Sequence, residues 1–254
     1  MSHVISRWPP TIAGLAALAL WQGTVWVTGV PAYLVPGPIA IVRAFLDAPT
    51  LLLASLASTL VVTATALAVS TMLGVGMALA VTASRWARAA IQPWAVALQV
   101  TPIVAIAPLI IAWVGEPFAA LVVCASIVAF FPIFSNTAIG LASPPGELLD
   151  LFRLNGAGRW ATLRLLRLPA ALPYFLAGLR ISGGLALVGA VVAEFVAGAG
   201  GFASGLAYRI LESGYRLQIP RMFAALVLLS AAGIATDTAL AALGRVLLHR
   251  RGGA

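Results

Sequence analysis

Long apolar runs separated by shorter polar segments dominate the hydrophobic pattern of this chain. An α-helix needs about 20 predominantly apolar residues to cross the hydrocarbon core of a bilayer. Six runs reach about that length, at positions 12–30, 56–81, 94–114, 118–139, 174–196 and 223–248. We therefore expect an all-α protein, a polytopic membrane bundle of six transmembrane helices that forms a single domain over residues 1–254. The first run follows Arg7 as a signal peptide would, but its apolar stretch is long, which favours an uncleaved helix.

The segments between the runs differ in length and polarity. Residues 33–49 are too polar and proline-rich to span, and the spacing of 39–46 predicts a short helix at the outer interface. Residues 140–173 form a long loop with four Arg and two acidic residues, and residues 198–220 form an outer connection rich in Gly and Arg. Prolines interrupt the third run (Pro102 and Pro108) and the fourth (Pro132). They predict either ordinary kinks or bent segments that line a pathway.

The composition agrees with a membrane protein and narrows its chemistry. Residues of the AVILMFWYC set make up 62% of the chain and charged residues only 9%, against about 25% charged in a typical soluble domain. Most soluble enzymes and disordered chains are thereby excluded. The chain has no Lys, so it cannot form a P-loop, which needs Gly-Lys-Ser/Thr. With one cysteine, Cys124, and histidines only at positions 3 and 249, neither a His/Cys metal site nor a Cys–His nucleophile pair is expected.

The distribution of the fifteen Arg residues predicts the orientation in the membrane. With the N-terminus in the cytoplasm, ten lie on the inner side and four on the outer side, which the positive-inside rule favours. Both termini are therefore expected in the cytoplasm. The inner residues are Arg7, Arg85, Arg88, Arg153, Arg159, Arg164, Arg167, Arg245, Arg250 and Arg251, and the outer ones are Arg43, Arg209, Arg216 and Arg221. Arg180 is expected near the inner end of the fifth helix.

The most informative segment is 147–173, within the long cytoplasmic loop. Its pattern predicts two short amphipathic helices, 147–154 and 160–168, on either side of the turn 155–158, with Pro169 ending the second. Several apolar side chains then lie in a loop that should face water. They could pack on the base of the bundle or on lipid headgroups, or they could dock into a groove of a partner protein. The periodicity leaves both interpretations open.

This loop resembles the EAA motif of binding-protein-dependent ABC importer permeases, which reads Glu-Ala-Ala, three residues, Gly, nine residues, Ile, one residue, Leu-Pro. The corresponding residues here are Asp150-Leu151-Phe152, Gly156, Leu166 and Leu168-Pro169. The spacing from Gly to Pro fits, while Asp150, Leu151-Phe152 and Leu166 depart from the consensus. Further segments are similar to permeases of the nitrate, sulfonate and taurine subgroup, and to those for thiamine-precursor pyrimidines. They include residues 36–38, 102–108, 131–134, 168–173, 193–194 and 219–223.

The resemblance implies one half of a transport pathway in a bacterial cytoplasmic (inner) membrane. Two permease subunits, normally a homodimer in this subgroup, would be surrounded by membrane lipid. Two separate ATPase subunits would hold ATP and Mg, with no cofactor in this chain. A periplasmic or lipid-anchored substrate-binding protein would deliver a small solute, and no nucleic acid is involved. Residues implied in coupling to the ATPase are Glu147, Asp150, Leu151, Phe152, Gly156, Arg159, Leu166 and Pro169. Gly156 would permit the tight turn between the two short helices.

Charged residues in or beside the membrane supply further candidates. Glu194 lies in an apolar run, where a carboxylate is costly. It could cap or pair with another helix or the outer loop, with Arg209 and Arg216 as candidate partners, or it could line the pathway or its outer gate. Pairing with arginine is the preferred interpretation. Arg180 and Pro102 are further pathway candidates. Arg209 and Arg216 would form a solvated rim, would contact the binding protein, or would form a positive vestibule that attracts an anion. Asp237 is expected to face the bundle.

Two other classes of function compete with the permease. A self-contained secondary transporter or channel should show more broken or charged helices and paired repeats. A membrane-embedded enzyme should show clustered His, Cys or acidic residues, which this chain lacks. The substrate stays open among nitrate-, sulfonate- and pyrimidine-type solutes.

Overall fold

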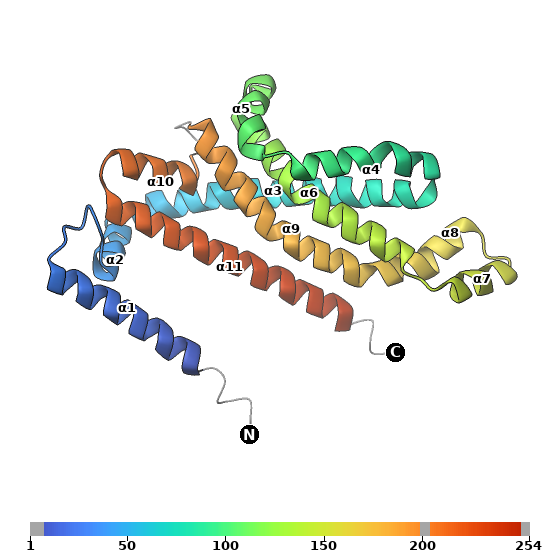
Figure 1. The fold of residues 1–254 in the computed structure, drawn as a ribbon, viewed down its shortest axis with the longest axis horizontal. Helices are drawn as coiled ribbons and strands as arrows, with labels where there is room; N and C mark the ends of the chain where they lie inside the picture. Colours follow the sequence, from blue (N-terminus) through green and yellow to red (C-terminus); the bar gives the residue numbers. More distant parts are fainter. Residues whose placement is uncertain (1–7, 199–203, 250–254) are drawn as a thin grey trace.

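Helices account for nearly all of the chain in the computed structural model, which describes residues 8–198 and 204–249, with the side chains of 8–10 left aside (Figure 1). Arg7, Arg250, Arg251 and His3, named in the sequence predictions, lie outside the described residues. The described residues contain no strand. The α-helices are α1 (Trp8–Thr28), α2 (Pro38–Asp47), α3 (Pro49–Ala83), α4 (Arg85–Val100), α5 (Ile103–Val114), α6 (Pro117–Ala142), α7 (Gly146–Leu154), α8 (Arg159–Thr162), α9 (Leu168–Ala197), α10 (Leu206–Tyr215) and α11 (Ile219–His249).

The predicted polytopic all-α bundle is confirmed. Within the described part of the chain, α1, α3, α6, the continuous segment Arg159–Ala197 and α11 are each long and apolar enough to cross a membrane, and the pair α4 and α5 gives a sixth candidate. The predicted short helix at 39–46 is α2. Helices α5 and α6 are joined by a short turn in which Gly115 adopts the left-handed conformation.

The third predicted span is not one helix. Helix α4 begins at Arg85, well before position 94, and the chain bends by 107° between α4 and α5. Thr101 and Pro102 lie at the bend in extended conformation. Proline lacks an N–H to continue the helix, and its ring forces the preceding residue out of the α conformation. The apolar run alone does not predict this break, although Pro102 lies at its position in the sequence.

A second correction concerns Pro169, which does not end a helix. Helix α8 continues through a π-helical stretch, Leu163–Arg167, into α9, so Arg159–Ala197 is one uninterrupted helical segment. The wider π turn lies immediately before Pro169, where the proline ring would otherwise meet a carbonyl of the preceding turn. The loop is thereby joined rigidly to the central helix of the bundle.

Helices α3, α6 and α9 form the centre of the bundle and pack closely through small residues. A Cβ added to Gly178 would lie 2.6 Å from the Pro132 carbonyl oxygen, and one added to Gly189 would lie 2.8 Å from Ala125 Cα. The buried Ser182 hydroxyl donates to the Ala129 carbonyl at 2.6 Å. Small residues let membrane helices approach this closely. Close packing is needed because lipid offers little hydrophobic force to hold helices together.

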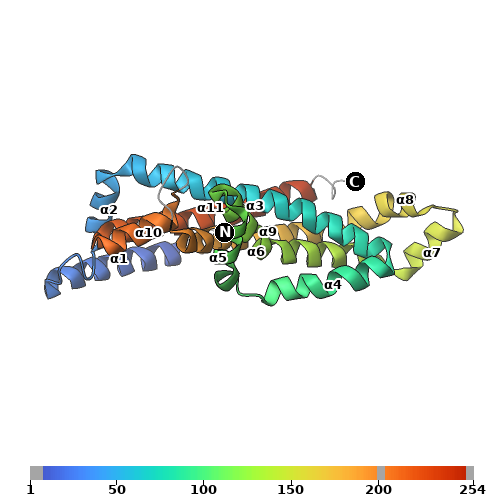
Figure 2. The same cartoon turned by 90° about the horizontal axis from the view of Figure 1, so that it is seen from above.

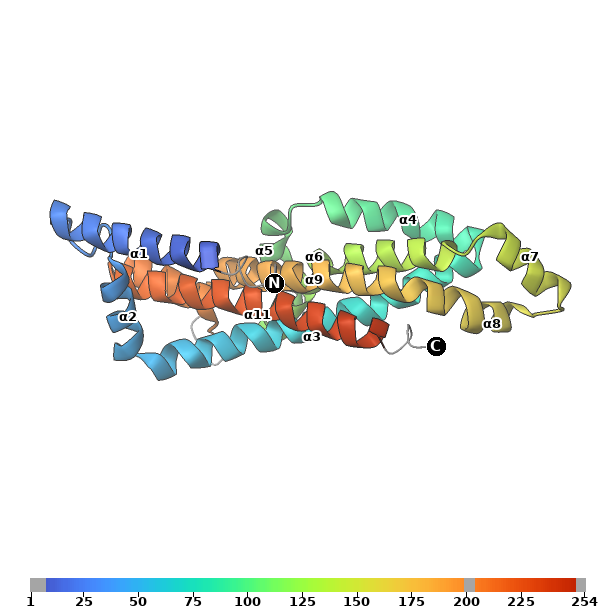
Figure 3. The ribbon, with the colours of Figure 1, turned by 90° about the horizontal axis from the view of Figure 1, so that it is seen from below.

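The bundle has two distinct ends. Helices α2 and α10 lie at one end, together with the first turns of α3 and α11, and helices α7 and α8 lie at the other (Figures 1 and 2). The first residues of α1 and the last of α11 point toward the α7–α8 end (Figure 3). Residues 11–20 of α1 are all exposed, so this helix stands largely outside the bundle.

Candidate functional site

The turn between α7 and α8 is built by local hydrogen bonds and one glycine. The Ala157 N–H donates to the Phe152 carbonyl at 2.9 Å, and the Asn155 side-chain amide donates to the Leu151 carbonyl at 2.8 Å, so both bonds satisfy carbonyls at the end of α7. Gly156 has a φ of 71°, in the left-handed region that favours glycine. The predicted role of this glycine in a tight turn is confirmed.

The α7–α8 loop extends away from the bundle (Figures 1 and 3). Several of its apolar side chains are exposed. Leu154 is 86% exposed and Trp160 is 71% exposed, and Leu148, Leu151 and Leu165 are exposed as well. The bundle therefore does not cover these side chains. Of the residues that the EAA resemblance implies, four lie on α7, one in the turn, one at the start of α8, one in the π-helical stretch and one at the start of α9: Glu147, Asp150, Leu151, Phe152, Gly156, Arg159, Leu166 and Pro169.

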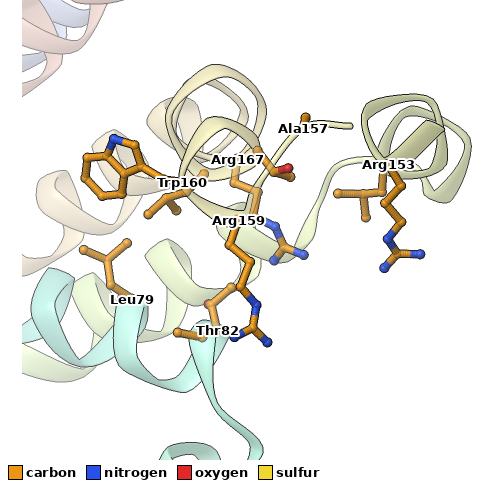
Figure 4. A pocket seen from close by; sticks show the side chains of 11 residues that line it. Leu79, Thr82, Arg153, Ala157, Arg159, Trp160 and Arg167 are labelled. Atoms are coloured by element: carbon orange, nitrogen blue, oxygen red, sulfur yellow. The ribbon is translucent and has the colours of Figure 1, made fainter. Parts of the chain in front are cut away.

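A cleft of about 530 Å³ separates this loop from the last turns of α3 (Figure 4). Arg159 and Arg167 lie on the α8 side of the cleft and Arg153 on the α7 side, with Thr82 of α3 below. The sequence predicted the arginines as inner-side charges but gave no signal that α3 would complete a cleft with them, because the two segments are far apart along the chain.

Glu194 does not pair with an arginine, so the preferred partner is wrong, but it does contact another helix and cap the start of α10, as the sequence also allowed. Its Oε1 accepts a hydrogen bond from the Thr59 hydroxyl at 2.8 Å, and its Oε2 accepts one from the Ala207 N–H at 3.0 Å. The Leu206 N–H donates to the Thr59 oxygen at 2.9 Å. The carboxylate is thus buried where α3, α9 and the first turn of α10 meet. The N–H of Ala207, in the first turn of α10, has no partner within its own helix, and the Glu194 carboxylate satisfies it.

Arg209 is occupied by a separate network on α10. Its guanidinium donates to Ser55 Oγ at 3.0 Å, Ser204 Oγ at 3.0 Å and the Glu212 carboxylate at 2.7 Å, and its side chain is only 17% exposed. Arg216 is exposed and pairs with the other oxygen of Glu212 at 3.0 Å. Of the two arginines predicted to contact a binding protein, only Arg216 offers an open side chain.

Arg180 forms a two-pronged ion pair with Asp237. Its Nε and Nη2 atoms each lie 2.7 Å from a different carboxylate oxygen, and the pair joins α9 to α11. Because α9 begins at Leu168 and not at position 174, Arg180 lies about 18 Å inside this helix rather than near its inner end, at about 1.5 Å per residue. The two side chains stay 54% and 47% exposed. Asp237 was expected to face the bundle, but its partner was not foreseen.

The sequence matches the family described as "Binding-protein-dependent transport system inner membrane component" over residues 70–248. The riboflavin transport system permease protein of Chloroflexus aurantiacus is 34% identical over 204 residues, which cover 76% of this chain and 74% of that protein. The formylaminopyrimidine transport permease protein of Halalkalibacterium halodurans is 33% identical over 243 residues, 95% of each chain.

A putative aliphatic sulfonates transport permease protein of Bacillus subtilis is 29% identical over 238 residues, which cover 92% of this chain and 84% of the relative. The family match over residues 70–248 runs through the bent α4–α5 pair, the α7–α8 loop and the Arg180–Asp237 pair. The chain therefore belongs to the family of binding-protein-dependent transport system inner membrane components and is an ABC importer permease, a transporter subunit and not itself an enzyme.

Proposed function

We propose that two copies of this chain form the pathway for a small solute, and that the α7–α8 loop couples the pathway to two separate ATPase subunits that carry ATP and Mg. A substrate-binding protein would deliver the solute at the α2–α10 end. The chain would lie in a bacterial inner membrane with both termini in the cytoplasm.

The uncovered helix pair α7–α8 carries the coupling proposal. Its apolar side chains extend beyond the bundle, so water would surround them unless a partner covered them. An amphipathic helix in this state is suited to a hydrophobic groove on another protein. Because α8 continues into α9 without a break, a force on the loop would move the central helix and with it the pathway.

The open face of α9 supports the second copy. This helix is packed against α3, α6 and α11, yet Tyr174, Ile181 and Val188 are exposed along one stripe beside the Arg180–Asp237 pair. A half-exposed charged pair deep in a membrane-spanning helix is costly against lipid. A second copy of the chain across a water-filled pathway would remove this cost.

The substrate of this chain is proposed only as a small solute selected by the binding protein. The relatives described above are named for riboflavin, formylaminopyrimidine and aliphatic sulfonates, which differ in size and charge. A common fold of the pathway with different solutes is consistent with selection outside the permease.

The substitution Gly156→Leu tests the coupling role. No atom lies within 4 Å of the added Cβ, so there is no clash, but the left-handed backbone costs a branched residue about 1–2 kcal/mol and the turn should change shape. We expect normal membrane insertion with loss of ATPase stimulation by the loaded binding protein. Gly158→Leu is the matched control, because Gly158 is equally open but has an ordinary φ of −67°. Full stimulation in the Gly156 variant would contradict the proposal.

A further inference from the structure

The cleft between α3 and the α7–α8 loop is lined by three arginines and by no acidic residue. Its lining residues are Leu79, Thr82, Ala83, Leu149, Arg153, Ala157, Arg159, Trp160, Thr162, Leu163 and Arg167. The arginines come from different parts of the loop, so the folded chain brings together charges that repel one another.

The arginines are only partly neutralised by the chain. Arg153 pairs with the exposed Asp150 at 2.9 Å, outside the lining of the cleft. Arg167 donates one N–H to the Leu141 carbonyl at 3.3 Å, which leaves other donors of its guanidinium free. Arg159 has no hydrogen bond or ion pair within residues 8–198 and 204–249. An anion with several acceptor oxygens would satisfy these donors, and guanidinium groups are well suited to phosphate.

The position of the cleft matches the surface of a membrane. Its floor is the last turn of α3, where a membrane-spanning helix ends. Trp160 is exposed at its edge and Trp86 is exposed at the start of α4, at the same end of the bundle. Tryptophan is enriched at the level of the lipid headgroups. The cleft is therefore within reach of a headgroup, whereas the tip of the loop extends beyond it.

The walls of the cleft are not uniformly polar. Leu79, Leu149 and Leu163 line it beside the arginines, and Leu165 and Leu168 are exposed along the helix that leaves it. A free inorganic anion would use only the guanidinium groups. A phospholipid would use both features, with its phosphate at the arginines and its acyl chains along the apolar helix surface.

We propose that this cleft binds the headgroup of an anionic phospholipid at the inner surface of the membrane. Basic pockets beside membrane helices bind such headgroups through the attraction between arginine and the phosphodiester. The bound lipid would bridge Arg153 of α7 and Arg167 of the π-helical stretch, and would thereby hold the two arms of the α7–α8 loop together. The site needs no ATPase to form, so it can be tested apart from the coupling role.

The test is lipid retention by the full chain, purified in detergent and titrated with phosphatidylglycerol or with zwitterionic phosphatidylcholine. Bound lipid is counted by native mass spectrometry. We expect one phosphatidylglycerol per chain to be held in preference to phosphatidylcholine. Arg153→Gln and Arg167→Gln should each weaken retention about fivefold, as expected for one arginine near the membrane surface. Arg245→Gln is the matched control, since Arg245 is an exposed arginine outside the cleft.

Four results would overturn the proposal. Equal retention of the two lipids, or unchanged retention in both cleft variants, would show that the cleft does not recognise an anionic headgroup. Full displacement of phosphatidylglycerol by inorganic phosphate, with phosphate bound in its place, would assign a free-anion site. Loss of ATPase binding in the cleft variants with lipid retention intact would assign the cleft to the ATPase. Arg167 also donates to the Leu141 carbonyl, so its replacement could disturb folding. In that case the variant of the exposed Arg153 is the one that tests the proposal.

Discussion

The hydrogen bonds around Glu194 allow a sharp test of what holds α10 in place. The Thr59 hydroxyl both donates to Glu194 Oε1 and accepts from the Leu206 N–H, at 2.8 and 2.9 Å. Replacing Thr59 with Val keeps the shape of the side chain and its β-branch while it removes both bonds. One carboxylate oxygen and one backbone N–H then stay buried without these partners.

The cost follows from the two groups left unsatisfied. Each buried polar atom that loses its partner costs about 1–3 kcal/mol, so Thr59→Val should destabilise the junction by about 2–6 kcal/mol. Because the bonds join α10 to α3 and α9, most of this loss should appear as local opening of α10. At the lower limit of about 2 kcal/mol, the opening equilibrium shifts roughly 30-fold.

Hydrogen–deuterium exchange of peptides covering residues 206–215 measures this opening. We expect exchange in the Thr59→Val protein to be at least about 30-fold faster than in the parent chain. Thr65→Val is the matched control, because Thr65 lies on the same helix, is only partly buried, and bonds only to the Val61 carbonyl of its own helix. Equal exchange in the two variants would refute the assigned role of the Thr59 hydroxyl.

Two further predictions follow from the packing and the charges of α9. Gly178→Ala places a Cβ 2.6 Å from the Pro132 carbonyl oxygen, an overpacking that costs about 1–3 kcal/mol. Its melting temperature should therefore lie roughly 2–12 °C below that of Gly184→Ala, whose Cβ meets open space. Equal melting temperatures would contradict the close α6–α9 contact. Arg180→Gln should reduce solute uptake by reconstituted vesicles because it leaves Asp237 uncompensated within a span, while the exchanged pair Arg180→Asp with Asp237→Arg should recover uptake. Uptake that stays equally low in the exchanged pair would show that the positions matter and the pair does not.

Local features of the loop could be predicted because they depend on neighbouring residues. Helix α7, the turn after it and the left-handed Gly156 follow from amphipathic spacing and from the conformational freedom of glycine. The prediction that the second short helix ends at Pro169 was wrong, because it too relied only on local sequence. Pro169 is a helix breaker by its own chemistry, but the preceding π turn makes room for it, and that turn has no clear pattern in the sequence.

The partners of the charged residues could not be predicted in the same way. Glu194 lies in an apolar run, and the arginines nearby along the chain made an ion pair the simplest expectation. In the structure, the Glu194 carboxylate instead accepts hydrogen bonds from a hydroxyl and a backbone N–H. The two candidate partners, Arg209 and Arg216, form ion pairs with Glu212. Which of several polar groups meets a buried carboxylate depends on how three helices pack.

The sequence by itself determined that the chain is an all-α membrane protein, that its long loop has the spacing of a coupling motif, and that an ATP site of the P-loop type is absent. These properties depend on composition, periodicity and short-range spacing. The tertiary structure alone decided that the third run bends by 107°, that Arg180 pairs with Asp237, and that α3 closes a cleft over Arg153 and Arg167. The physical reason is that these contacts join segments far apart in the chain, where packing geometry and the need to satisfy buried polar groups select the partners.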